Sequence, residues 1–228
     1  MSFIQSVRDT LNTSDADQRK AQEQLDFLMA MAQSKLELYK IQLHESLSGL
    51  ESSNDPVKIV GDPVAFQQAY NCNVASNPND GITAAINQFF AGSSDSVKTG
   101  FKSLVSVGLQ AFLGATSLGQ TETVQTFITM EHNAIIRVDV KLWRYNFSDS
   151  GIIGTISNAM CYIFCKSVVD HTKVSLDTLT YLISAQTGDD LQAVQAYIAQ
   201  LRAIWLALDG ASPAAIQAEV ATADKTRP

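Results

Sequence analysis

Charged residues are scarce in this chain, and its basic residues form no cluster. Asp, Glu, Lys and Arg make up 17% of the 228 residues, against about a quarter in an ordinary globular protein. The 16 Lys and Arg form no run, and the net charge is −7. A chain of this charge repels nucleic acid and anionic lipid as a whole, so we expect no nucleic-acid partner.

Cysteines and targeting signals are also few. The three cysteines, Cys72, Cys161 and Cys165, are an odd and sparse set that does not fit a disulfide framework. The N-terminus, MSFIQSVRDTLN, lacks the basic segment and apolar core of a secretory signal, and Ser2 excludes N-myristoylation. The sequence therefore predicts a protein made in soluble form, either cytoplasmic or exported without an N-terminal signal.

Familiar catalytic and ligand-binding motifs are missing. The sequence has no phosphate loop, dinucleotide fingerprint, nucleophile elbow, zinc pattern or calcium loop. Cys161 and Cys165 have the spacing of two metal ligands, but no second pair of Cys or His lies nearby. We expect no catalytic residue, no metal site and no cofactor, and an enzyme of unfamiliar class is the third of our hypotheses on function.

The strongest pattern is a long amphipathic helix from Ser14 to about Gly49, since Ser suits the N-cap and Gly the C-terminus. At 1.5 Å per residue it spans about 50 Å and needs partner helices, which favours a bundle. Leu36 and Leu43, at the centre of its apolar stripe, should be buried. The stripe comprises Leu25, Leu28, Ala32, Leu36, Tyr39, Leu43, Leu47 and Leu50, and Phe27, Met31, Leu38 and Ile41 widen it.

Strict alternation of apolar and polar residues marks a β-hairpin at about 123–147. The alternation runs from Ala134 to Phe147, and Glu131, His132 and Asn133 supply the turn. Helical segments are expected before and after it, including 64–72, 82–91, 150–169, 173–186 and 190–208. We therefore predict a mainly α fold. It is a single helical domain over 1–228, a bundle with a long N-terminal helix, a small two-stranded β-hairpin in the middle and a disordered tail at 223–228.

Two uncharged segments, 103–121 and 150–165, flank this hairpin. With 19 and 16 residues, they are at or just below the length that spans a bilayer as a helix. The simplest interpretation is that both are buried core helices. The functional interpretation is that they are stored in the soluble form and released at a membrane. The residues that would then contact lipid are Phe101, Leu104, Val105, Leu109, Phe112, Leu113, Ile152, Ile153, Ile156, Ile163 and Phe164.

The order of these segments is similar to that of helical pore-forming toxins with a hydrophobic β-tongue, a resemblance of arrangement. It implies a membrane-active protein of the toxin or virulence class, with a lipid membrane as partner and a homo-oligomer as its assembly. The alternative is a cytosolic interaction or scaffold protein that binds through the long helix. Burial as a free thiol is the simpler interpretation of Cys165. The second interpretation is lipidation, because Cys165 closes an apolar run before Lys166 and so resembles a juxtamembrane lipidation site.

Overall fold

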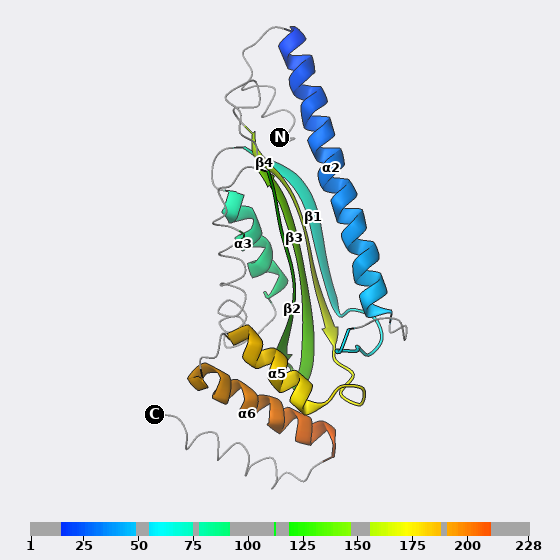
Figure 1. Cartoon of the computed structure of the whole chain (residues 1–228), viewed down its shortest axis with the longest axis vertical. Coiled ribbons are helices and arrows are strands. Elements are labelled where there is room, and N and C mark those ends of the chain that lie inside the picture. Colours follow the sequence, from blue (N-terminus) through cyan, green and yellow to red (C-terminus); the bar gives the residue numbers. More distant parts are fainter. Residues whose placement is uncertain are drawn as a thin grey trace.

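A four-stranded antiparallel sheet with helices on both faces forms the described part of the molecule (Figure 1). The computed structural model describes residues 15–48, 55–74, 78–91, 112, 119–146, 156–187 and 191–210. Its strands are β1 (Ala65–Val74), β2 (Gly119–Glu131), β3 (Ala134–Asn146) and β4 (Ile156–Val168), in the spatial order β1-β4-β3-β2. Its helices are α2 (Asp15–Leu47), α3 (Pro78–Phe89), α5 (Leu176–Thr187) and α6 (Leu191–Leu208).

The prediction of a mainly α fold, a helical bundle with a small two-stranded hairpin, is therefore wrong. The hairpin at 123–147 exists as β2 paired with β3, but it is half of a larger sheet. Two segments that the sequence suggested were helices, 64–72 and 150–165, contribute to β1 and β4 instead. The long helix agrees with α2, while the tail at 223–228 lies outside the described residues.

The helix expected at 150–165 is wrong because β4 is a central strand with both faces covered. Every residue from Ala159 to Lys166 is buried. The sequence of β4 has no charged residue before Lys166 and shows no period of two, so its apolar run looks like that of a buried helix. The aromatic and β-branched run of Tyr162, Ile163 and Phe164 favours a strand, and pairing with β1 and β3 on both sides decides the structure.

The helix expected at 64–72 is replaced by the edge strand β1. Asp62 and Pro63 fit a helix cap and first turn in sequence, but in the structure they precede a strand. From Val64 to Tyr70 exposed and half-buried residues alternate, as in a strand with one covered face. Ala65 lies opposite Lys166, and the pairing continues along β4. Pairing with an apolar strand outweighs a weak local helix signal.

The turn between β2 and β3 sets which side chains face which layer. His132 and Asn133 have φ of 52° and 60°, the left-handed pair of a type I′ turn, whose twist suits an antiparallel hairpin. In the resulting register the odd-numbered residues of β3, such as Trp143, face α2. The even-numbered residues, such as Val140, face α3.

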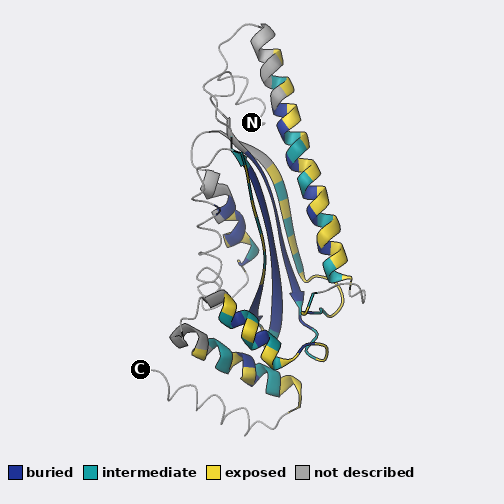
Figure 2. Ribbon diagram, in the orientation of Figure 1, coloured by how far each residue is buried: buried dark blue, intermediate teal, exposed yellow. Residues whose placement is uncertain are grey.

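Helix α2 covers one face of the sheet along most of its length (Figures 1 and 2). Leu28, Leu36 and Leu43 pack with Trp143 and Ile163 in one cluster. The prediction that Leu36 and Leu43 are buried is confirmed, because they are 3% and 4% exposed. Their partner is a sheet rather than other helices.

The opposite face and one end of the sheet are covered by the remaining helices. Ile86 of α3 packs in a cluster with Phe164 of β4. Leu179 of α5 and Leu201 of α6 pack around Ile128, near the end of β2. Figure 2 shows the result, with buried strands between helices whose outer surfaces are exposed.

Candidate functional site

The described residues among those predicted to contact a membrane are buried in the core. Phe112, Ile163 and Phe164 are no more than 2% exposed. Ile156 begins β4, and its side chain is not described. The others lie outside the described residues: Phe101, Leu104, Val105, Leu109, Leu113, Ile152 and Ile153.

Phe112 is held on the α3 side of the sheet by Arg144 of β3. The guanidinium carbon lies 5.1 Å from the centroid of the Phe112 ring, and Nη2 donates a hydrogen bond of 2.7 Å to the Phe112 carbonyl. Burial lowers the pKa of Arg144. Arg144 therefore anchors the middle of the uncharged segment 103–121 to the sheet.

Cys161 and Cys165 are buried free thiols on the α2 face of β4. Four residues of a strand separate them by about 13 Å, which is too far for a disulfide. Burial raises the pKa of Cys161 to about 12 and that of Cys165 to about 11. A neutral thiol without solvent contact is a poor nucleophile, so lipidation of Cys165 requires that the fold open first.

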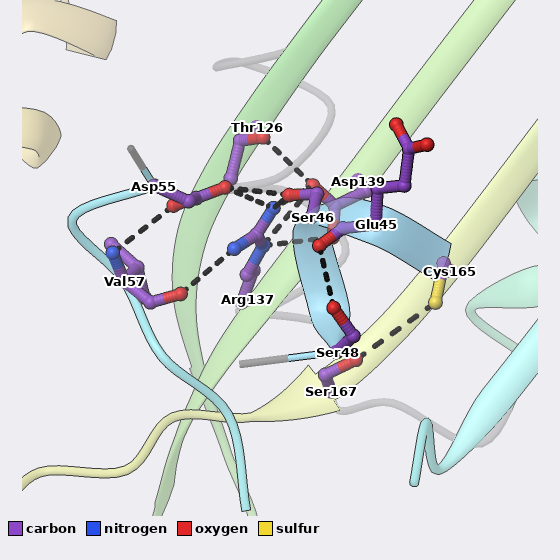
Figure 3. A network of polar contacts seen from close by, with 10 residues as sticks. All are labelled: Glu45, Ser46, Ser48, Asp55, Val57, Thr126, Arg137, Asp139, Cys165 and Ser167. Carbon is purple, nitrogen blue, oxygen red and sulfur yellow. Dashed lines mark hydrogen bonds and ion pairs between the residues drawn. The ribbon is translucent and has the colours of Figure 1, made fainter. Parts of the chain in front are cut away.

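Arg137 of β3 is the centre of a buried polar network beneath the C-terminal end of α2 (Figure 3). Its Nε donates to both carboxylate oxygens of Asp139, at 2.9 and 3.1 Å, and its Nη2 lies 2.6 Å from Asp55. Its Nη1 donates to the Val57 carbonyl and its Nη2 to Ser46 Oγ, each at 2.8 Å. These five residues, here called the Arg137 network, tie α2 and the 55–57 loop to the sheet.

The Arg137 network sets one positive charge, that of Arg137, against the two negative charges of Asp139 and Asp55. Burial alone would lower the pKa of Arg137, but its hydrogen bonds to Asp139 and the negative charges of Asp139 and Asp55 outweigh burial and raise the pKa. Arg137 is 1% exposed. An enclosed, mutually paired set of this kind fits a structural tie between layers rather than a catalytic constellation.

A second polar set fixes how α2 is rotated on the sheet. Lys35 forms an ion pair of 2.7 Å with Glu122 of β2, and Tyr39 donates to the Leu142 carbonyl at 3.1 Å. Burial would raise the pKa of Glu122, but the hydrogen bond and the positive charge of Lys35 help to outweigh it and lower the pKa. Lys141 reaches Gln42 at 3.4 Å from the same side. The Lys35 side of α2 therefore faces β2.

On the α3 face, Lys166 of β4 pairs with Glu131 at 2.9 Å. Its ammonium nitrogen also lies 4.5 Å from the ring centroid of Phe90 and 5.2 Å from that of Phe89. Lys166 is 6% exposed, so this cation joins α3 to the sheet and is shielded from ligands in solution.

The outer side of α2 carries an exposed apolar row that sequence reasoning assigned to the buried stripe. Phe27 is 68% exposed, Leu38 44% and Ile41 58%. A step of 100° per residue puts these positions on the side of the helix opposite Leu36, and that signal was present in the sequence. We name Phe27, Ala30, Ser34, Leu38 and Ile41 the outer stripe.

A shallow hollow lies along the outer stripe. It has a volume of about 480 Å³. Both small and large side chains line it. The residues that line it are Ala30, Gln33, Ser34, Glu37, Leu38 and Ile41.

Within the described ranges, the residues offer little for other kinds of site. No group of three or more His, Cys, Asp or Glu is placed to hold a metal ion in that part of the chain. None of the helices described combines the length and the apolar character needed to cross a membrane.

Comparison of this chain with protein-family models, with curated proteins and with solved structures finds no match in any of the three.

Proposed function

We propose that this protein is an interaction protein that binds an amphipathic helix of a partner along the outer stripe of α2. The observation that carries the proposal is the exposure of Phe27, Leu38 and Ile41, at 68%, 44% and 58%, on the side of α2 turned away from the sheet. Isolated exposed apolar residues are ordinary, but a row of them over about 21 Å of helix is typical of a contact surface.

The spacing of the outer stripe favours a helix as the occupant. Steps of three, four, four and three residues separate its members, which is the spacing by which paired helices meet. Ala30 and Ser34 leave the hollow beside Leu38, where a large side chain of the partner inserts between residues of α2. Glu37 and Lys40, of opposite charge, lie beside the row and supply a polar rim.

The test uses a photo-cross-linking amino acid in place of Ser34. The cross-linked protein is identified by mass spectrometry, purified, and titrated with the parent protein and with Leu38→Arg. We expect Leu38→Arg to weaken binding at least about tenfold, because it buries a charge in an apolar contact.

Tyr181→Arg is the matched control, since Tyr181 is a large exposed side chain on α5, 71% exposed. It should bind as the parent does. Equal binding of the partner by Leu38→Arg and the parent would exclude the outer stripe as the contact surface.

We propose membrane action as a second function, and the uncharged segment 103–121 favours it. Phe112 is the described residue of that segment's interior, and it is buried under Arg144. Insertion therefore requires that this segment leave the sheet first. The glycines Gly108 and Gly114 would then allow close helix contacts in lipid.

Leakage of dye from liposomes tests membrane action. Leu109→Lys should abolish leakage, because a charge in the middle of an inserted helix costs about 3 kcal/mol. Ser106→Lys, on the more polar side of the segment, should also block leakage while leaving the fold intact. If the parent protein does not bind vesicles, the membrane proposal is wrong.

A further inference from the structure

Strand β1 is an edge of the sheet, and its outward backbone groups can be assigned from the register. Alternate residues of an antiparallel strand bond to alternate neighbours. Val169 donates to the Ile135 carbonyl at 2.9 Å, so the odd-numbered residues of β4 bond to β3. The even-numbered residues of β4 therefore bond to β1, where their partners are odd-numbered, as in Ala65 opposite Lys166.

The even-numbered residues of β1 consequently direct their N–H and C=O groups away from the sheet. Among them are Phe66, Gln68 and Tyr70, which lie opposite residues of β4 without hydrogen bonds to them. No other described strand lies beyond them. Their side chains lie on the α2 face, and Phe66 and Tyr70 are 48% and 37% exposed. Figure 2 shows that exposed and half-buried residues alternate along β1.

The sequence of β1 offers little against strand addition, and its irregularity in register lies at one end, between Asn73 and Val74. Ala65–Val74 contains no charged residue and no proline, whereas natural edge strands commonly use charges or prolines against pairing. The other edge strand, β2, carries Glu122 in its ion pair with Lys35. The two edges therefore differ in charge, and no described strand pairs with the outer side of β1.

We propose that two copies of this chain pair their β1 strands antiparallel about a two-fold axis at Gln68. Two four-stranded sheets then become one sheet of eight strands. The partner is a second copy of this chain. The contact includes none of the five members of the outer stripe of α2, although Glu37 and Lys40 border both surfaces.

This register makes the edge self-complementary. With Gln68 opposite its symmetry mate, Phe66 of each copy lies opposite Tyr70 of the other. Cross-strand aromatic pairs of this kind stabilise a sheet. Because β1 is uncharged, self-pairing puts no like charges opposite each other. Because each β1 edge can pair antiparallel with the β1 edge of a second copy, the two chains can form an isologous dimer.

The position of α2 fits the same axis. α2 contacts β4 most, and Phe66 and Tyr70 of β1 remain 48% and 37% exposed on the same face, so its axis runs over β4. With strands about 4.8 Å apart, the two copies of α2 would lie antiparallel and about 14 Å apart on one face of the joined sheet. That is wider than the roughly 8–10 Å of packed helices, so the helices do not collide and only long side chains can meet between them.

The facing sides of the two helices also complement each other in charge. Lys35 and Gln42 contact groups on β2 and β3, so the opposite side of α2, with Glu37 and Lys40, faces the axis. These two residues pair within one chain at 2.7 Å. In an antiparallel arrangement each can also meet its opposite charge on the second copy.

Sedimentation equilibrium or light scattering tests the dimer with the full chain. The chain mass is 24.7 kDa, and we expect twice that mass at concentrations of about 100 µM, above the micromolar range of modest interfaces. Gln68→Lys should weaken the dimer at least tenfold, because it sets two like charges opposite each other at the axis. Gln120→Lys makes the same exchange on β2 and should leave the dimer unchanged.

Disulfide trapping tests the register. Gln68→Cys should give an oxidised dimer, because the two Cα atoms at the axis lie about 5.5 Å apart, within reach of a disulfide. Phe66→Cys alone should stay monomeric under denaturing, non-reducing conditions, since its symmetry mate lies about 13 Å away. The parent protein controls for its own thiols.

A parent protein that is monomeric at every concentration would overturn the proposal, as would a dimer that Gln68→Lys leaves intact. Equal cross-linking by Phe66→Cys and Gln68→Cys would refute the antiparallel register. If Leu38→Arg loses partner binding while the dimer stays intact, that result bears on the outer stripe alone and leaves the dimer proposal unaffected.

Discussion

Single charged residues join the layers of this protein. Arg137 and Lys166 are 1% and 6% exposed, and each is paired with a carboxylate from a neighbouring element or strand. Arg137 lies at a position of β3 where sequence alternation predicts a solvent-facing residue, and Lys166 lies near the end of β4. Helices cover those positions, so ion pairs replace water around the charges. A buried pair adds little net stability, but the loss of one partner is costly.

Arg137→Met should destabilise the fold by about 3–5 kcal/mol, because it leaves a carboxylate buried without its cation. That carboxylate is Asp139, which is 4% exposed. Urea unfolding monitored by tryptophan fluorescence measures the change. The control is Lys40→Met, which removes a surface pair with Glu37 and should cost no more than about 1 kcal/mol. Similar losses in the two variants would contradict the structural role of the Arg137 network.

The buried thiols predict how stability depends on alkaline pH. The pKa of Cys161 is raised from 9.0 to about 12, and that of Cys165 to about 11. Because the folded pKa exceeds the unfolded one, this stabilisation is complete below pH 9 and is lost as the pH rises toward these folded pKa values. Each thiol adds up to about 1.4 kcal/mol per pH unit to that loss.

Unfolding free energies of the parent and of Cys161→Ala/Cys165→Ala, measured from pH 8 to pH 11, check this dependence. The parent should lose stability more steeply than the double variant. Part of the loss should remain in the variant, since burial also raises the pKa of Tyr39 and of Tyr197. Parallel curves would mean that the thiols are accessible to solvent in the native state.

At the scale of elements, α2 has two apolar sides with different roles. Leu36 is 3% exposed and packs on the sheet, whereas Leu38 is 44% exposed and lies in the outer stripe. Both residues are leucines on the same helix, so substitutions at the two positions can distinguish the packing role of α2 from its proposed binding role. Burial of the first stabilises the fold, while the second is available for a partner.

Leu36→Ala should destabilise the protein by about 2–5 kcal/mol, and Leu38→Ala by less than about 1 kcal/mol. Chemical denaturation of both variants side by side measures the difference. A large loss for Leu38→Ala would mean that the outer stripe is already covered in the folded protein. The interaction proposal would then fail.

Local patterns predicted some elements and failed on others for a physical reason. α2 follows from its three-and-four spacing, and the β2–β3 hairpin follows from alternation with His132 and Asn133 at the turn. β4 could not be inferred in this way, because its uncharged run before Lys166 shows no alternation, whereas β3 alternates although both its faces are covered. β1 was obscured by Asp62 and Pro63, which resemble a helix start. Strand pairing is a long-range interaction that local patterns do not contain.

The candidate surfaces were predictable only in part. The outer stripe could have been found from Phe27, Leu38 and Ile41, because their positions around the helix differ from that of Leu36. The edge character of β1 could not be inferred, since it depends on the strand order of the sheet. The membrane-contact set included Ile163 and Phe164, which are core residues of β4.

At the scale of the whole molecule, β4 is the element on which the others depend. It pairs with β1 on one side and β3 on the other, and its two faces pack against α2 and α3. Removing it would divide the sheet and expose both cores. Any release of the 150–165 segment at a membrane therefore requires near-complete unfolding, whereas α3, α5 and α6 can separate at lower cost.

Hydrogen exchange followed by mass spectrometry tests this hierarchy. Amides of β4 from Ala159 to Lys166 should be among the slowest to exchange, with an opening free energy close to that of global unfolding, because their exchange requires the sheet to open. Amides of α6 should exchange faster, since that helix packs on one end of the sheet. Adding vesicles should leave β4 protected. Faster exchange of β4 with vesicles, while β2 and β3 stay protected, would mean that this strand leaves an otherwise intact fold and that the hierarchy is wrong.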